Sequence, residues 1–91
     1  MEIHEIIQAK WIKSYMVELT FSDLQKGRVD LKKYLGQGVF KDLTDLRKFK
    51  QFKVDAELGT IIWPNGADID PEILYRATFR RSRSDSFSNA A

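Results

Sequence analysis

The single histidine of the chain, His4, is the side chain best suited to proton transfer near neutral pH. A general base needs a nucleophile or an orienting partner beside it, and one histidine cannot form a multi-histidine metal site. The chain has no cysteine, which excludes thiolate catalysis and zinc sites of the cysteine type. We therefore interpret His4 as a structural or surface residue and expect no catalytic site, no metal and no cofactor.

Three carboxylates, Asp68, Asp70 and Glu72, alternate along the segment that precedes a predicted helix. Carboxylate oxygens suit a hard cation, but the spacing does not match the calcium loop of an EF-hand, because no bidentate acid follows at the required position. Capping explains the same residues: Asp70 can accept from the first backbone N–H groups, and Pro71 fits the first helical position. We prefer this structural interpretation to metal binding.

The two tryptophans are large side chains for a chain of 91 residues. Tryptophan is enriched at interface hot spots but also contributes strongly to cores. Trp63 follows Ile61-Ile62 and precedes Pro64, so we expect it to pack at the end of a sheet. Trp11 lies near Lys10 and Lys13 and is the better candidate for an exposed anchor.

The net charge of +2 and the pI near 9.0 come from the end of the chain. Setting aside Arg80, Arg81, Arg83 and Asp85 leaves twelve basic and twelve acidic residues in the body. Within that body, residues 41–53 hold five bases and two acids, whereas residues 54–75 hold five acids and no base. This separation either orients a protein partner or forms solvated faces with weak ion pairs, and we prefer the second interpretation.

Alternating side chains predict a strand over residues 15–21, with Tyr15, Val17, Leu19 and Phe21 on the buried face. Further strands are predicted over residues 2–11, 28–31, 52–55 and 60–63. The apolar spacing then changes to three, which predicts a short helix whose buried stripe is Phe40, Leu43, Leu46 and Phe49. A second helix is expected to begin at residues 70–72.

These elements predict an α+β fold: a single domain over residues 1–79 with a small, mostly antiparallel sheet of about five strands and two short helices. Residues 80–91 are rich in Arg and Ser, and we expect a flexible, disordered tail. No apolar run reaches the roughly 18 residues that a membrane helix needs. The N-terminus also lacks the features of a signal peptide, so we expect a cytoplasmic protein with no membrane partner.

The block over residues 60–75, which contains Trp63-Pro64-Asn65-Gly66 and Asp70-Pro71-Glu72, resembles the DUF2442 family, a bacterial domain of unknown function. Phe21-Ser22-Asp23 and residues 38–49 resemble other parts of the family pattern. The chain departs from it after Asp23, where Leu24-Gln25-Lys26 replaces a tight Asp-Gly turn. The resemblance implies a small α+β domain. It also implies that some members are encoded beside a second small protein, as in a toxin–antitoxin pair.

Our leading hypothesis is a non-enzymatic protein-interaction module, in its specific form the antitoxin-like member of a two-protein system. It would bind an unidentified protein through a sheet edge or the face between Trp63 and Tyr75; the candidate residues are Trp11, Trp63, Asn65, Asp68, Asp70 and Tyr75. The alternative is nucleic-acid binding through Lys48, Lys50, Lys53, Arg80, Arg81 and Arg83. A hydrolase using His4 or Asp68 is the third. The sequence leaves the oligomeric state open.

Overall fold

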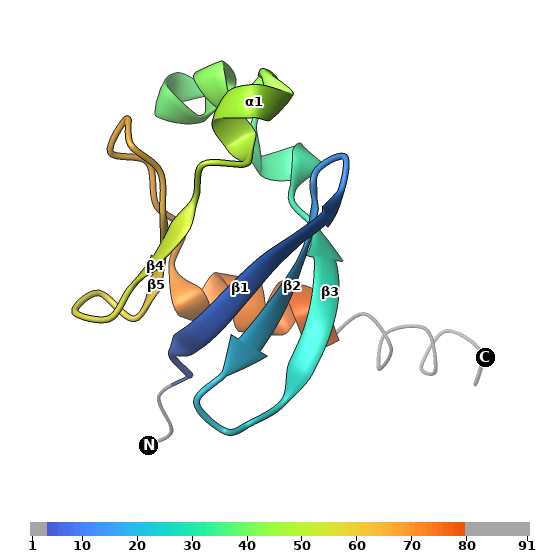
Figure 1. The fold of residues 1–91 in the computed structure, drawn as a ribbon, viewed down its shortest axis with the longest axis vertical. Helices are drawn as coiled ribbons and strands as arrows, with labels where there is room; N and C mark the ends of the chain where they lie inside the picture. Colours follow the sequence, from blue (N-terminus) through green and yellow to red (C-terminus); the bar gives the residue numbers. More distant parts are fainter. Residues whose placement is uncertain (1–3, 80–91) are drawn as a thin grey trace.

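The computed structural model describes residues 4–79 and has an α+β fold, as predicted (Figure 1). The five strands form two antiparallel sheets, where the sequence suggested one. A three-stranded sheet has the order β1-β2-β3, and β4 pairs with β5 in a separate hairpin beside β1. The strand bounds are β1 Ile6–Lys13, β2 Met16–Phe21, β3 Lys26–Asp30, β4 Lys53–Asp55 and β5 Thr60–Ile62. The expected tail over residues 80–91 lies outside the described residues.

Strand β2 is the centre of the larger sheet, and its alternation is the one that the sequence predicts. Val17, Leu19 and Phe21 are buried, while the residues between them are partly exposed. Strand β1 does not alternate so simply, because its register shifts between Ile6 and Gln8. The resulting bulge lets Ile6 and Ala9, three residues apart, stand opposite inward-facing residues of β2.

The predicted central helix is mainly a 3-10 helix. Residues Gly38–Thr44 form the 3-10 helix η2, and only Leu46–Phe49 form the α-helix α1. An apolar spacing of three is compatible with the 3.0 residues per turn of a 3-10 helix as well as with an α-helix, and the stripe runs through both forms here. Asp45 begins α1 by accepting a hydrogen bond from the Arg47 backbone N–H at 3.0 Å. A further 3-10 turn, η1, spans Lys32–Tyr34.

The C-terminal helix is continuous over residues 71–79 and crosses one face of the larger sheet (Figure 1). Asp70 caps it as predicted, since its Oδ1 accepts from the Glu72 backbone N–H at 2.8 Å and Pro71 follows at the first helical position. The helix lies very close to β3. A Cβ atom added at Gly27 would stand 2.6 Å from a methyl carbon of Thr78, so this crossing requires glycine in the strand.

Candidate functional site

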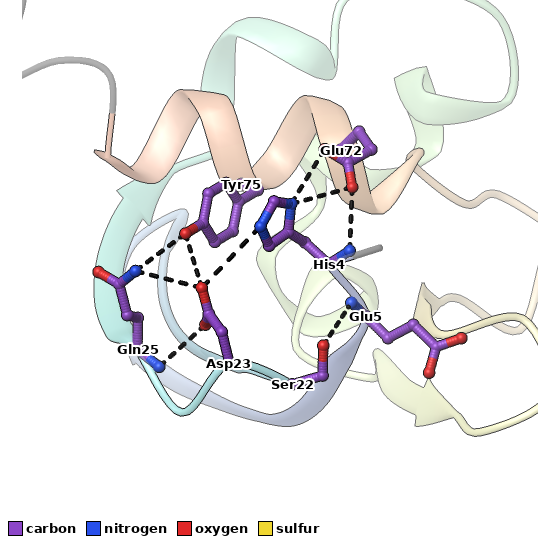
Figure 2. Close-up of polar contacts among 7 residues, drawn as sticks. All are labelled: His4, Glu5, Ser22, Asp23, Gln25, Glu72 and Tyr75. Atoms are coloured by element: carbon purple, nitrogen blue, oxygen red, sulfur yellow. Dashed lines mark hydrogen bonds and ion pairs between the residues drawn. The ribbon is translucent and has the colours of Figure 1, made fainter. Parts of the chain in front are cut away.

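Three segments far apart in the sequence meet at His4 (Figure 2). The His4 backbone N–H donates to Glu72 Oε2 at 3.0 Å, and the ring Nδ1 lies 3.1 Å from the same oxygen. On the other side, the ring Nε2 is 3.9 Å from Asp23 Oδ2 in the β2–β3 turn. The ring stacks on Tyr75 with centroids 3.6 Å apart, and its side chain is only 14% exposed. His4 therefore ties the start of the chain to both the turn and the C-terminal helix.

Asp23 is the second centre of this cluster. The Tyr75 hydroxyl donates to Asp23 Oδ2 at 2.7 Å, and the Gln25 side-chain amide donates to the same oxygen at 3.1 Å. The Gln25 backbone N–H donates to Asp23 Oδ1 at 3.0 Å, which closes a local side-chain turn. Oδ1 thus closes the turn itself, and Oδ2 joins the turn to the helix through Tyr75 (Figure 2).

Both carboxylates of the cluster are stabilised in their charged form. The pKa of Asp23 is held below its ordinary 3.8, chiefly by the hydrogen bond from the Tyr75 hydroxyl. The pKa of Glu72 is held below its ordinary 4.5, chiefly by the backbone N–H of His4 and then by its ring. The cluster accordingly carries two negative charges at neutral pH.

The β2–β3 turn itself contains an unfavourable backbone conformation. Phe21 N–H donates to Gln25 C=O at 2.9 Å, and Leu24 N–H donates to Phe21 C=O at 2.8 Å, so the loop has three residues. Such loops place their third residue in the left-handed region, where glycine is preferred. Here that residue is Leu24, with φ +71° and 78% of its surface exposed. The turn therefore holds a large apolar side chain out in solvent at a backbone cost.

A second turn lies beside the first at the same end of the molecule. Ile6 N–H donates to Gly59 C=O at 2.8 Å, which joins the start of β1 to the β4–β5 turn. On its other side, Glu5 exchanges hydrogen bonds with Ser22, at 2.7 and 3.1 Å. We define the hairpin end as residues 4–7, 22–25 and 56–59; in Figure 1 the β2–β3 turn lies at the bottom and the β4–β5 turn projects to the left, with the start of β1 between them.

The hairpin end combines exposed apolar side chains with carboxylates. Leu24, Ile7 and Leu58 are 78%, 52% and 56% exposed, and Glu5, Asp23 and Glu57 are exposed beside them. The twelve residues of the hairpin end include no Lys or Arg. Separated apolar side chains on a surface are ordinary, and these three lie in segments that also carry exposed carboxylates.

The candidate partner-binding residues from the sequence occupy different places. Trp63 is 2% exposed and donates its indole N–H to Phe49 C=O at 2.8 Å, so it is a core residue and not part of an accessible face. Trp11 is partly buried, donates to Ser14 C=O at 2.8 Å and lies 4.5 Å below the Lys50 ammonium. Of the six candidates, Tyr75 is the one that the structure joins to the cluster at His4.

Asn65, Asp68 and Asp70 are exposed, and all three have structural contacts: Asp68 forms an isolated β-bridge with Ile62, and Asp70 caps the C-terminal helix. Asn65 donates to Val39 C=O at 2.9 Å and accepts from Ala67 N–H at 3.0 Å, which fixes its turn against η2. A shallow groove of about 300 Å³ lies there; its lining is Asp42, Leu43, Lys48, Gln51, Pro64 and Asn65. Within residues 4–79, no group of three or more His, Asp or Glu side chains is arranged to hold a metal ion.

The alternative nucleic-acid residues lie away from the hairpin end. Lys48, Lys50 and Lys53 are exposed, and the first two belong to α1 and its C-cap at the top of Figure 1. Arg80, Arg81 and Arg83 lie outside the described residues. In the described part of the chain, no ion pair joins the basic segment 41–53 to the acidic segment 54–75. The two charged segments therefore do not neutralise each other by direct contact.

Sequence reasoning missed Leu24, Gln25 and Asp23 as functional candidates. The one sequence feature that pointed to them was the departure from a tight Asp-Gly turn after Asp23. It indicated a longer loop, but it did not indicate that Leu24 adopts a left-handed backbone conformation. His4 was interpreted as a structural or surface residue, and the structure places its ring between the carboxylates of Asp23 and Glu72.

These observations define a small α+β domain with an acidic hairpin end that is held in place by hydrogen bonds. The sequence profile of one family, described as protein of unknown function (DUF2442), matches residues 6–80. The chain belongs to the DUF2442 family. No curated protein and no solved structure matches it. Among the described residues, no helix has the length and apolar character needed to cross a membrane.

Proposed function

We propose that this protein is a non-enzymatic protein-interaction module that docks through the hairpin end, with Leu24 as its anchor. The observation that carries the proposal is the conformation of Leu24, which is left-handed and 78% exposed. Glycine at this position would remove both the strain and the exposed apolar surface. A leucine that costs folding free energy and gains almost no burial is explained by burial against a partner.

The surroundings of Leu24 support this role. The turn is fixed by hydrogen bonds to Asp23, by the Tyr75 hydroxyl and by the pairing of Ser22 with Glu5. A contact that is already ordered loses less conformational entropy on binding, so a rigid turn is a favourable anchor. The His4 ring is held between two carboxylates, which suits it to fixing the turn.

The test is affinity capture from a nuclease-treated native lysate with wild type, Leu24→Ser and the matched control Val39→Ser. Val39 is 54% exposed and lies in η2, away from the hairpin end. We expect a protein that Leu24→Ser loses and Val39→Ser retains. With the partner purified, Leu24→Ser should weaken Kd by about thirtyfold, the effect of a hot-spot residue. Equal binding by all three proteins would refute the proposal.

The specific form of this proposal is an antitoxin-like member of a two-protein system, which rests on what the family resemblance implies. Its test is co-expression with the product of an adjacent small gene. Growth arrest by that product should be relieved by the wild type and by Val39→Ser, but not by Leu24→Ser. Relief by all three variants would separate any antitoxin role from the hairpin end.

Nucleic-acid binding through Lys48, Lys50 and Lys53 is the second candidate, and the exposure of all three supports it. It predicts that capture is lost on nuclease treatment and weakens steeply with salt. Leu24→Ser should leave such binding unchanged, because the lysines lie away from the hairpin end.

A further inference from the structure

The charges around Leu24 specify the chemistry of the surface that would receive it. Glu5, Asp23 and Glu57 are exposed within the hairpin end, and Glu72 borders it with a side chain that is 41% exposed. No Lys or Arg belongs to its twelve residues. Asp23 directly precedes Leu24 and Glu57 directly precedes Leu58, so each of these exposed leucines has a carboxylate next to it in the chain.

Two basic side chains, Lys26 and Arg76, also lie near these carboxylates. Lys26 begins β3 directly after the turn, opposite Thr20 and on the side of the sheet away from the core. Arg76 follows Glu72 by one helical turn; its charge contributes to lowering the pKa of Glu72, and its side chain also lines a separate hollow with Lys33 and Tyr34. The His4 ring is packed on Tyr75 and is 14% exposed. The four carboxylates Glu5, Asp23, Glu57 and Glu72 outnumber Lys26 and Arg76, so a partner at the hairpin end would meet an excess of negative charge.

We propose, on the basis of the proposed function, that the hairpin end binds a protein surface where an apolar pocket for Leu24 is bordered by Lys or Arg side chains. Covering carboxylates with a neutral or acidic surface leaves them desolvated without compensation, whereas basic side chains give charge-assisted hydrogen bonds. Opposite charge also accelerates association by steering the encounter. A phosphate-rich ligand is disfavoured at this end because it carries the same sign of charge.

A second copy bound through the same end is disfavoured for the same reason, since an isologous contact would bring the carboxylates together. The basic segment 41–53 of a second copy is a different case, because it carries the opposite charge. Lys48 lines a groove there, so head-to-tail association is an outcome that the experiment must distinguish.

The experiment is photo-crosslinking in native cells with p-benzoylphenylalanine in place of Leu24, and with the same residue in place of Val39 as the control. Mass spectrometry identifies each adduct and the attachment residue. We expect one discrete protein adduct at position 24 that position 39 does not give, attached at an apolar site with Lys or Arg nearby on the partner surface. An adduct at an acidic or uncharged surface, or on a second copy of this chain, would overturn the inference.

Association kinetics with the purified partner give an independent measurement. We expect the association rate to fall by about tenfold or more from low to high salt. Glu57→Lys should reduce the rate, whereas Lys48→Glu, at the other end, should not. A rate insensitive to salt and to Glu57→Lys would overturn the inference even if Leu24 remained essential. Absence of any adduct specific to position 24 would instead refute the proposed function itself.

Discussion

The conformation of Leu24 leads to a stability prediction that needs no partner. Leu24→Ala removes most of the side chain but keeps a residue with a Cβ atom at φ +71°. Leu24→Gly removes the side chain and also the steric conflict. The difference between these two variants therefore isolates the cost of the left-handed backbone from the loss of side-chain contacts.

The expected magnitude follows from two opposing terms. A left-handed conformation costs a residue with a Cβ atom about 1–2 kcal/mol. Glycine loses more backbone entropy on folding, which costs about 0.5–1 kcal/mol relative to alanine. We therefore expect Leu24→Gly to be more stable than Leu24→Ala by about 0.5–1 kcal/mol. For a domain of this size, that difference corresponds to about 2–8 °C in Tm.

The assay is equilibrium urea unfolding at neutral pH, followed by tryptophan fluorescence. Trp63 is a suitable reporter because it is 2% exposed and packs among Phe49, Phe52 and Phe40. The midpoints should be compared at a common slope, since a changed slope would indicate a change in the denatured state. Thermal unfolding by circular dichroism provides a second measurement.

Leu58 is the matched control, because it is also an exposed leucine in a hairpin turn but has no positive φ. There the order should reverse, with Leu58→Gly less stable than Leu58→Ala by about 0.5–1 kcal/mol. If the stability difference between the Gly and Ala variants were the same at Leu24 as at Leu58, the backbone at Leu24 would carry no strain. The argument that leucine is retained there for binding would then fail.

Three further predictions concern the elements that hold the hairpin end in place. The folded pKa values of Asp23 and Glu72 are lowered, so these carboxylates contribute stability above about pH 5 and lose it as the pH falls through the folded values. When the urea midpoint is measured over a series of pH values, Glu72→Gln should make it depend less on pH in the acid range. Asp70→Ala removes the helix cap and should cost about 1 kcal/mol in urea unfolding, whereas Asp68→Ala, which is exposed, should have little effect. Gly27→Ala would place a Cβ atom 2.6 Å from a helix methyl carbon, so it should lower the free energy of unfolding by about 1–3 kcal/mol.

The outcomes that contradict these predictions are equally specific. An unchanged acid dependence in Glu72→Gln would mean that the contacts with His4 do not stabilise the charged carboxylate. If Asp70→Ala and Asp68→Ala lowered the free energy of unfolding equally, capping by Asp70 would not be what stabilises the helix. Gly36 has open space around it, so a Gly36→Ala variant as unstable as Gly27→Ala would show that the crossing of β3 and the helix is not tight.

The sequence by itself determined the elements whose signals are local. The period of two over residues 15–21 defines β2, because successive side chains of a strand point to opposite faces. Asp70-Pro71-Glu72 defines the start of the helix, because capping depends on neighbouring residues alone. The spacing of three after Val39 identified a helix but not its 3-10 form, which differs from an α-helix by less than one residue per turn.

Tertiary structure alone decided the hairpin end. His4 meets Glu72 across 68 positions of sequence, and Tyr75 meets Asp23 across 52, so no local pattern could place these side chains together. The left-handed conformation of Leu24 depends on a three-residue loop closed between Phe21 and Gln25, and glycine would have been the local expectation. The sequence listed the charges and the apolar side chains, but only the packing of two turns around residues 4–7 put them on one surface, because surface composition depends on which segments become neighbours.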